Sequence, residues 1–139
     1  MYLTSLIYAS RARNIDEDAL RVILEKARKN NERLDVTGVL LFNSSYFLQC
    51  LEGGRESVNF LYRTILRDDR HDDPAILDYR TIDCRKFEKW RMAYVGESVL
   101  RRDEILKCSV SSTFQPYNMS GEGAWQLLAS IGSLSETQP

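Results

Sequence analysis

The chain has 139 residues, 43% of them hydrophobic, which suits one domain with a core large enough to fold without disulfides or metals. With 19 basic and 20 acidic side chains the net charge is −1, so charge gives no reason to expect nucleic acid or a membrane surface as a partner. A single histidine and three separated cysteines, in no CxxC pair, argue against a multi-histidine metal site, a zinc site and a disulfide framework.

The first residues, MYLTSLIYAS, lack the basic segment and the long apolar segment of a signal peptide. No window of the sequence reaches the roughly 18 apolar residues that are needed to span a bilayer. We therefore expect a soluble, cytoplasmic protein with reduced cysteines and no membrane contact.

The first half of the chain alternates strand and helix patterns. Residues 2–9 are rich in β-formers, and residues 16–30 carry apolar side chains at helical spacing. A turn between Asp35 and Gly38 leads into a strand over 39–42. Asn43-Ser44-Ser45 then predicts a tight hairpin, from which residues 46–52 return antiparallel.

The second half continues with an amphipathic helix over about 56–66 and two strands over 75–83 and 88–95. The order βαββαββ predicts an α+β fold, a ferredoxin-like sandwich with two helices on one face of a mixed sheet.

A C-terminal helical extension is expected from the pattern over 103–108 and from a longer amphipathic helix capped by Ser120. It could cover the open sheet face or pack on another subunit. We divide the chain into a domain over 1–97, an extension over 98–134 and a flexible tail over 135–139.

Gln49 is the most conspicuous polar residue, because it interrupts the apolar strand FLQCLEG. Strand alternation places it on the same side as Phe47 and Leu51. An unpaired buried amide costs about 1–3 kcal/mol, so a partner must satisfy it. The first and third strands of such a sheet are central neighbours, and Tyr8 can therefore lie beside Gln49.

Other candidate residues have structural explanations that compete with a functional one. Tyr8 could be an ordinary strand aromatic, and Asn31, placed just past the first helix, could simply end it. Trp90 and Met92, on one side of the last strand, could be plain core. His71 lies in the acidic turn RDDRHDDP, which by composition suits a solvent-exposed loop.

Together these residues suit a binding slot more than a reaction centre. A phenol and two amides around an apolar slot can satisfy the polar edge of a flat heteroaromatic ring. Arg28, Lys29 and Arg70 lie near the expected helix ends and could meet a phosphate group. No catalytic base is evident, so we predict a cofactor-binding protein that is not an enzyme.

Five segments, LIYAS, NN with DVTGVLL, FLQCLEG, DDRH and FEKWRM, resemble the BLUF domain, a flavin-binding sensor of blue light. The resemblance covers residues 1–97 in order and spacing. The later segment TFQPYNMSGE is similar to the C-terminal region of short, PixD-like members that have no attached output domain.

The resemblance implies FAD between the two helices, on the sheet. It implies that Tyr8 donates an electron and a proton to the excited flavin, that Gln49 is the switching amide, and that Asn31 binds the pyrimidine edge. By the same resemblance Asp68, Arg70 and His71 lie near the ring and ribityl chain, which replaces the solvent-loop interpretation of His71. Met92 and Trp90 would then sense the glutamine from the last strand.

We therefore predict a blue-light photoreceptor that signals to a separate partner protein and self-associates through the open sheet face or the terminal helices. The alternative is an RRM-like nucleic-acid-binding module, but the third strand lacks the basic and aromatic motif of that class. A small hydrolase is the third choice, supported only by Gly53-Gly54 before a helix.

Overall fold

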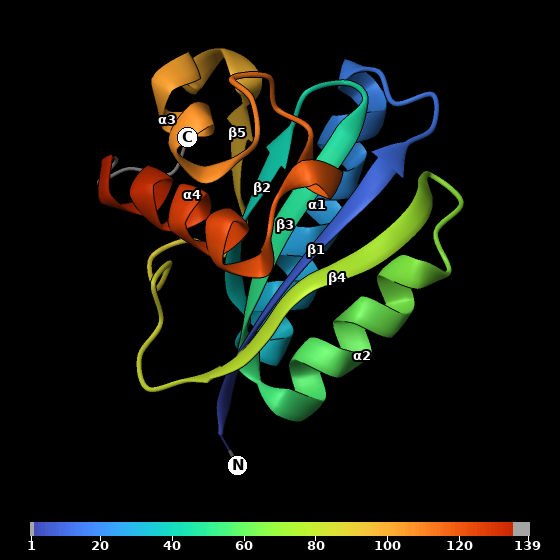
Figure 1. Ribbon diagram of the computed structural model, residues 1–139. Coiled ribbons are helices and arrows are strands. Elements are labelled where there is room, and N and C mark those ends of the chain that lie inside the picture. Colours follow the sequence, from blue (N-terminus) through green and yellow to red (C-terminus); the bar gives the residue numbers. More distant parts are fainter. Residues whose placement is uncertain (1, 135–139) are drawn as a thin grey trace.

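The computed structural model describes residues 2–134, which form a five-stranded sheet in the order β4-β1-β3-β2-β5 with helices on both faces (Figure 1). The strands are β1 (Leu3–Ala12), β2 (Thr37–Phe42), β3 (Tyr46–Gly54), β4 (His71–Ile82) and β5 (Ala93–Gly96). The α-helices are α1 (Glu17–Leu34), α2 (Arg55–Leu66), α3 (Arg102–Cys108) and α4 (Gly121–Leu134), with short 3₁₀ turns η1 (Glu97–Val99) and η2 (Pro116–Asn118). The predicted order βαββαββ and the ferredoxin-like class are confirmed.

The two central strands, β1 and β3, run antiparallel, and their register places Tyr8 opposite Gln49. The hairpin before β3 forms because the Asn43 side chain accepts hydrogen bonds from the backbone N–H groups of Ser45 and Tyr46. Ser44 adopts a positive φ of 72° at the tip. The predicted pairing of Tyr8 and Gln49 on one sheet face is confirmed.

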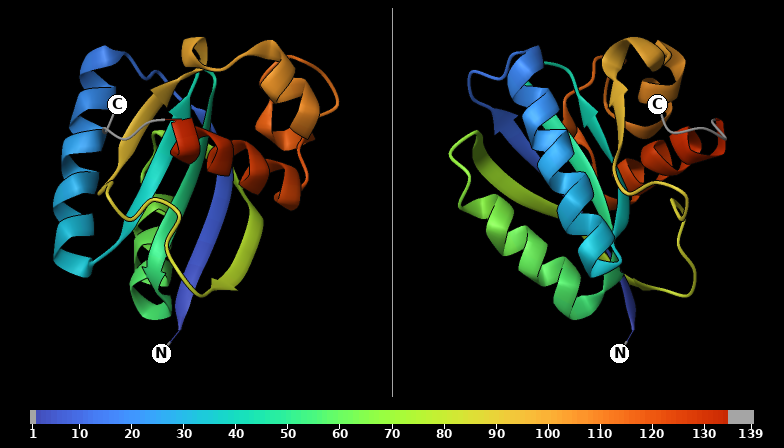
Figure 2. Two further views of the ribbon diagram at one scale, coloured as in Figure 1. Left: turned by 90° about the vertical axis from the view of Figure 1, so that its left-hand side faces the viewer. Right: turned by 180° about the vertical axis from the view of Figure 1, so that it is seen from behind.

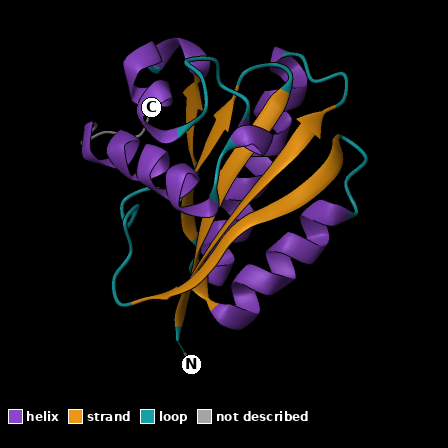
Figure 3. Cartoon of the chain, viewed as in Figure 1, coloured by secondary structure: helices purple, strands orange, loops and turns teal. Residues whose placement is uncertain are grey.

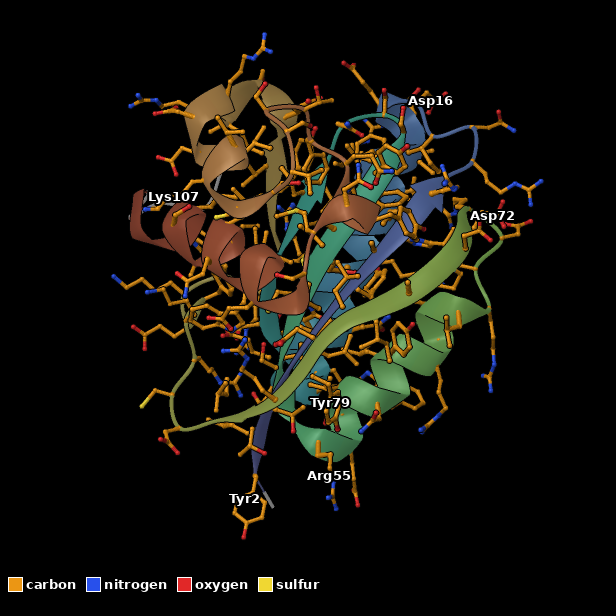
Figure 4. All side chains as sticks on the ribbon, in the orientation of Figure 1. Tyr2, Asp16, Arg55, Asp72, Tyr79 and Lys107 are labelled. Atoms are coloured by element: carbon orange, nitrogen blue, oxygen red, sulfur yellow. The ribbon has the colours of Figure 1, made fainter. Side chains whose placement is uncertain are left out.

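Helices α1 and α2 both cover one face of the sheet, as the view from behind shows (Figure 2). Asp16 caps α1 by accepting a hydrogen bond from the backbone N–H of Ala19, and Leu20 and Leu24 are buried beneath it. At the start of α2, Asn59 donates to the Tyr79 hydroxyl of β4, and Figure 4 shows Tyr79 close to Arg55 at this end of the sheet. This side of the sheet will be called the helix-pair face.

The opposite face is covered by the C-terminal extension, with α4 lying across the strands (Figure 1). Leu127 and Leu128 of α4 are buried against this face, and Arg80 of β4 bonds to Glu122 and lies over the Trp125 ring. This side will be called the extension face. Because it is not bare, self-association through an open sheet face, one of our two expected routes, is excluded for this arrangement.

The last strand is shorter than predicted. It spans Ala93–Gly96 and pairs in parallel with β2, whereas the prediction placed it over 88–95. Residues 83–92 form an irregular connection (Figure 3). Two features of this connection differ from strand geometry: the Trp90 N–H donates to the Phe87 carbonyl, and the Trp90 carbonyl accepts from Gly38. Strand alternation therefore does not apply to Trp90 and Met92.

Two further expectations concern the ends of the chain and the membrane. The predicted flexible tail, 135–139, lies outside the described residues. Among residues 2–134, no helix combines the length and the apolar character that a bilayer crossing demands.

Candidate functional site

A cavity of about 530 Å³ opens between α1, α2 and the helix-pair face. Its apolar walls come mainly from the two helices, with Ile23, Leu24 and Ala27 from α1 and Leu61 and Ile65 from α2. Its floor is the sheet, which contributes Tyr8 and Gln49, and the other polar groups that line it are Asn31, Asp68, Arg70 and His71. The cavity has the composition of a site for a flat, largely apolar ligand with a polar rim.

Gln49 lies on the cavity floor and is satisfied on both sides. Its Oε1 accepts a short hydrogen bond from the Tyr8 hydroxyl, and its Nε2 donates to Met92 Sδ at 3.3 Å. Tyr8 and Met92 are fully buried, and Gln49 is only 6% exposed. These contacts form a continuous chain from a phenol through an amide to a thioether.

Tyr8 lies in surroundings that keep its proton in place. Burial, helped by nearby Tyr62 and Asp68, raises the pKa of the Tyr8 phenol far above its ordinary value. The Tyr62 ring lies 5.4 Å from the Tyr8 ring, centroid to centroid. Burial therefore disfavours loss of the Tyr8 proton in the resting state.

Asn31 is buried inside α1, which corrects the prediction that it follows the end of a helix over 16–30. The helix continues to Leu34 and ends at Asp35, which adopts a left-handed conformation with φ 54°. The Asn31 side chain donates a short hydrogen bond to the Arg91 carbonyl. The residue thus joins α1 to the connection before β5 at the edge of the cavity.

Asp68, Arg70 and His71 come together at the turn from α2 to β4. The Asp68 carboxylate accepts hydrogen bonds from the backbone N–H and the guanidinium of Arg70. His71 opens β4, bonds to Ser10 Oγ through Nδ1 at 2.8 Å, and packs on Phe47 with 4.6 Å between ring centroids. The structure places His71 at the cavity wall, where composition alone favours a solvent-exposed loop.

Arg28 and Lys29 do not line the cavity, whereas Lys26 and Arg67 do. Arg28 instead donates from Nε to the Met92 carbonyl at 2.9 Å. A helical projection at 100° per residue does not find this difference, because Lys26 and Arg28 fall on either side of the arc formed by Ile23, Ala27 and Leu24. It separates only Lys29, which falls on the opposite side of the helix.

Trp90 and Met92 lie on opposite faces of the sheet, which corrects their placement on one side. Met92 belongs to the core of the helix-pair face and contacts Gln49. Trp90 is buried on the extension face and stacks on Phe87, with 5.8 Å between ring centroids. The irregular backbone before β5 therefore connects the cavity with the core beneath the C-terminal helices.

His71 gives the site a predictable dependence on pH. Burial lowers the pKa of His71, against the opposing pull of Asp68, so the unfolded chain takes up the proton first as pH falls below about 6.5. The stabilising effect of the neutral ring is present above that pH and is lost as pH falls through the folded pKa. The free energy of unfolding should decline by at most about 1.4 kcal/mol per pH unit from this group.

Urea unfolding at several pH values between about 7.5 and 5.5 measures this decline, and His71→Gln should lack it. An identical decline in wild type and His71→Gln would assign the effect to other groups.

The comparisons with known proteins agree with this site. A model of the family described as "BLUF: Sensors of blue-light using FAD" matches residues 3–93. The chain is 39% identical over 108 residues to the "Blue light- and temperature-regulated antirepressor BluF" of Escherichia coli, covering 76% of this chain and 26% of that protein. It is 33% identical over 100 residues to "Photoactivated adenylate cyclase subunit beta" of Euglena longa, covering 70% and 12%.

Solved structures of similar length match the whole described arrangement. The photo-activated state of BlsA superposes with a TM-score of 0.87 at 30% identity, covering 99% of both chains. The dark state of BlrB superposes with a TM-score of 0.80 at 32% identity, covering 95% and 96%. By contrast, the chain spans about a quarter or less of the length of the E. coli and Euglena relatives.

The family is described as a sensor, in agreement with the prediction that the chain is not an enzyme, and the RRM-like alternative is not favoured. The matched region contains the cavity, the Tyr8–Gln49–Met92 chain of contacts and the turn that carries His71. The chain belongs to the BLUF family, the sensors of blue light that use FAD.

Proposed function

We propose that the cavity holds the FAD ring and that light is converted into a rearrangement of the Gln49 amide. The single observation that carries this proposal is the chain of contacts from the Tyr8 hydroxyl through Gln49 to Met92 Sδ, which forms the cavity floor. When bound, FAD would absorb blue light, and its excited ring would be a strong electron acceptor.

The described residues fit such a cofactor. The apolar helix walls suit the faces of a flat ring, and the amides of Asn31 and Gln49 suit the carbonyl and N–H groups at its edge. Lys26, Arg67 and Arg70 line the same cavity and suit the phosphates. Asp68 and His71 also line it, and we propose that they meet the ribityl chain. Arg28 and Lys29, which the sequence predicts for the phosphates as well, do not line the cavity, and Arg28 donates to the Met92 carbonyl instead.

The residues themselves supply the switch. Tyr8 can release its proton toward Gln49 Oε1 only when its ring loses an electron, because burial raises its pKa in the resting state. The Gln49 amide keeps nearly the same shape when it rotates or tautomerises, yet donor and acceptor exchange places. One hydrogen bond contributes only about 0.5–1.5 kcal/mol net. Two fully bonded arrangements of the amide can therefore be close in free energy, and both can be populated.

Output would pass through the connection before β5. Met92 touches Gln49 on one face and Trp90 packs beneath the extension on the other, so a change at the amide can reach α3 and α4. In this proposal residues 1–97 form the sensing unit and residues 98–134 transmit the signal. One relative is named an antirepressor, and we propose that this chain likewise binds a separate regulatory protein with light-dependent affinity.

Self-association is proposed to use the extension, since the sheet face beneath it is covered. Val99, Leu106 and Val110 are exposed apolar side chains there, at 66%, 56% and 76%. Sedimentation of the protein in darkness and under blue light tests this part: a monomer under both conditions contradicts it.

An absorption spectrum before and after blue illumination tests the proposed function directly. The purified protein should be yellow, should show a flavin spectrum, and should shift toward the red under blue light with full reversal in darkness. A colourless protein that does not take up added FAD would contradict the proposal.

A further inference from the structure

Glu52 is a buried carboxylate that the light switch described above does not use. It lies in β3, three residues after Gln49, but on the extension face, and its exposure is only 2%. A charged group in such a position is costly unless it is bonded on all sides. The hydrogen-bond donors around the Glu52 carboxylate therefore indicate its role.

The Glu52 carboxylate holds the chain that leads to the sensing residues. Its oxygens accept hydrogen bonds from the backbone N–H of Lys86 at 2.6 Å, from the backbone N–H of Phe87 at 2.9 Å, and from Thr37 Oγ1 at 3.0 Å. Hydrogen bonds that backbone N–H groups donate to a charged carboxylate are stronger than those between neutral groups. One side chain of β3 thus fixes the start of the irregular connection to β5.

Arg85 completes this arrangement from the other side. Its guanidinium donates to Thr37 Oγ1, to the Glu52 carbonyl and to the Asp35 carbonyl, at 3.0, 3.0 and 2.7 Å. Burial raises the pKa of Glu52, while the bonds from Lys86 and Phe87, together with Arg85, favour the charged form. We call Glu52, Thr37 and Arg85 the anchor.

The anchored residues lead directly to the sensing residues. Phe87 stacks on Trp90, and the Trp90 N–H donates to the Phe87 carbonyl at 3.0 Å. Two residues later Met92 accepts from Gln49, and its carbonyl is held by Arg28. The connection is therefore fixed at both ends, by the anchor at 85–87 and by α1 at 91–92.

We propose that Glu52 is a positioning residue that sets the lifetime of the light state by holding Phe87, and through it Trp90 and Met92, in the dark arrangement. This role depends on the proposed function. Without the anchor, the dark arrangement, in which Met92 contacts Gln49, is less stable relative to the light state. The protein should then recover more slowly from the light state to the dark state.

Glu52→Gln tests the role, because it preserves the shape but presents an amide NH₂ where an acceptor is needed. The flavin-loaded variant should keep its flavin and its red shift, and it should recover in darkness about threefold more slowly, as expected for loss of a single hydrogen bond. Thr37→Val, which removes the donor to Glu52 and the acceptor for Arg85, should change recovery in the same direction. In a Trp125→Phe background, Trp90 is the sole tryptophan, and its emission should change with Glu52→Gln.

Two control variants separate anchoring from charge and from general stability. Glu56→Gln removes the same charge from an exposed position of α2, and Val58→Ala weakens the buried contact of α2 with the sheet. Both should recover at the wild-type rate. Wild-type recovery in Glu52→Gln, or equal slowing in Val58→Ala, would overturn the role of Glu52.

If Glu52→Gln does not fold, Thr37→Val and Arg85→Gln carry the same test, and wild-type recovery in both would overturn the proposal. Absence of any red shift in the wild-type protein is a different result. It would contradict the proposed function, and the role of Glu52 with it.

Discussion

Tyr8→Phe is expected to keep its flavin and to lose the light-induced red shift. The phenyl ring preserves the packing of Tyr8 in the core of the helix-pair face, where Tyr62 and His71 lie against it. What disappears is the hydroxyl that donates to Gln49 Oε1, and with it the proton whose release the switch needs. Gln49 Oε1 is then buried without its donor, which should lower the free energy of unfolding by about 1–3 kcal/mol.

The measurement is the difference spectrum before and after blue illumination, at equal flavin content. Tyr62→Phe is the matched control, because it makes the same chemical change 5.4 Å away on a residue that does not line the cavity. Tyr62→Phe should retain the shift. A complete and reversible shift in Tyr8→Phe would remove Tyr8 from the proposed mechanism.

The pairing of the central strands β1 and β3 and the helix α1 could be predicted from local sequence patterns. Period-2 alternation predicts the face of β3 on which Gln49 lies, and the βαββ order predicts that β1 lies beside β3. Together they predict that Tyr8 of β1 is the partner of the Gln49 amide. The apolar spacing over residues 16–30 likewise predicts a helix, which the structure shows as α1. These features depend on regular backbone, for which spacing translates directly into direction.

The connection before β5 could not be predicted in the same way. Its backbone is held by hydrogen bonds that Lys86, Phe87 and Arg85 donate to Glu52, which is distant in sequence. Such long-range bonds override the alternation that would put Trp90 and Met92 on one side. Asn31 was misplaced for a similar reason. Asparagine commonly occurs where helices end, but here α1 continues to Leu34 and the Asn31 side chain donates to the Arg91 carbonyl.

Gln49→Leu should leave the protein yellow and abolish the normal light state. Leucine approximates the volume of glutamine but has neither acceptor nor donor, so both the Tyr8 and the Met92 contact are lost. The Tyr8 hydroxyl is then buried without its partner, at a cost of about 1–3 kcal/mol in the free energy of unfolding. Without an amide that can exchange donor and acceptor, illumination has no second bonded arrangement to select.

Met92→Leu separates the two contacts of the amide, since it removes only the thioether acceptor and keeps the Tyr8 bond. It should retain the red shift and change the rate of dark recovery by about twofold to tenfold, the range that corresponds to one hydrogen bond.

Gln126→Leu is the matched control for Gln49→Leu, because it makes the same chemical change at an exposed site on α4. It should behave as wild type. A normal red shift in Gln49→Leu would show that the signal does not arise from this amide, and the Tyr8 hydroxyl would then need another partner in the cavity.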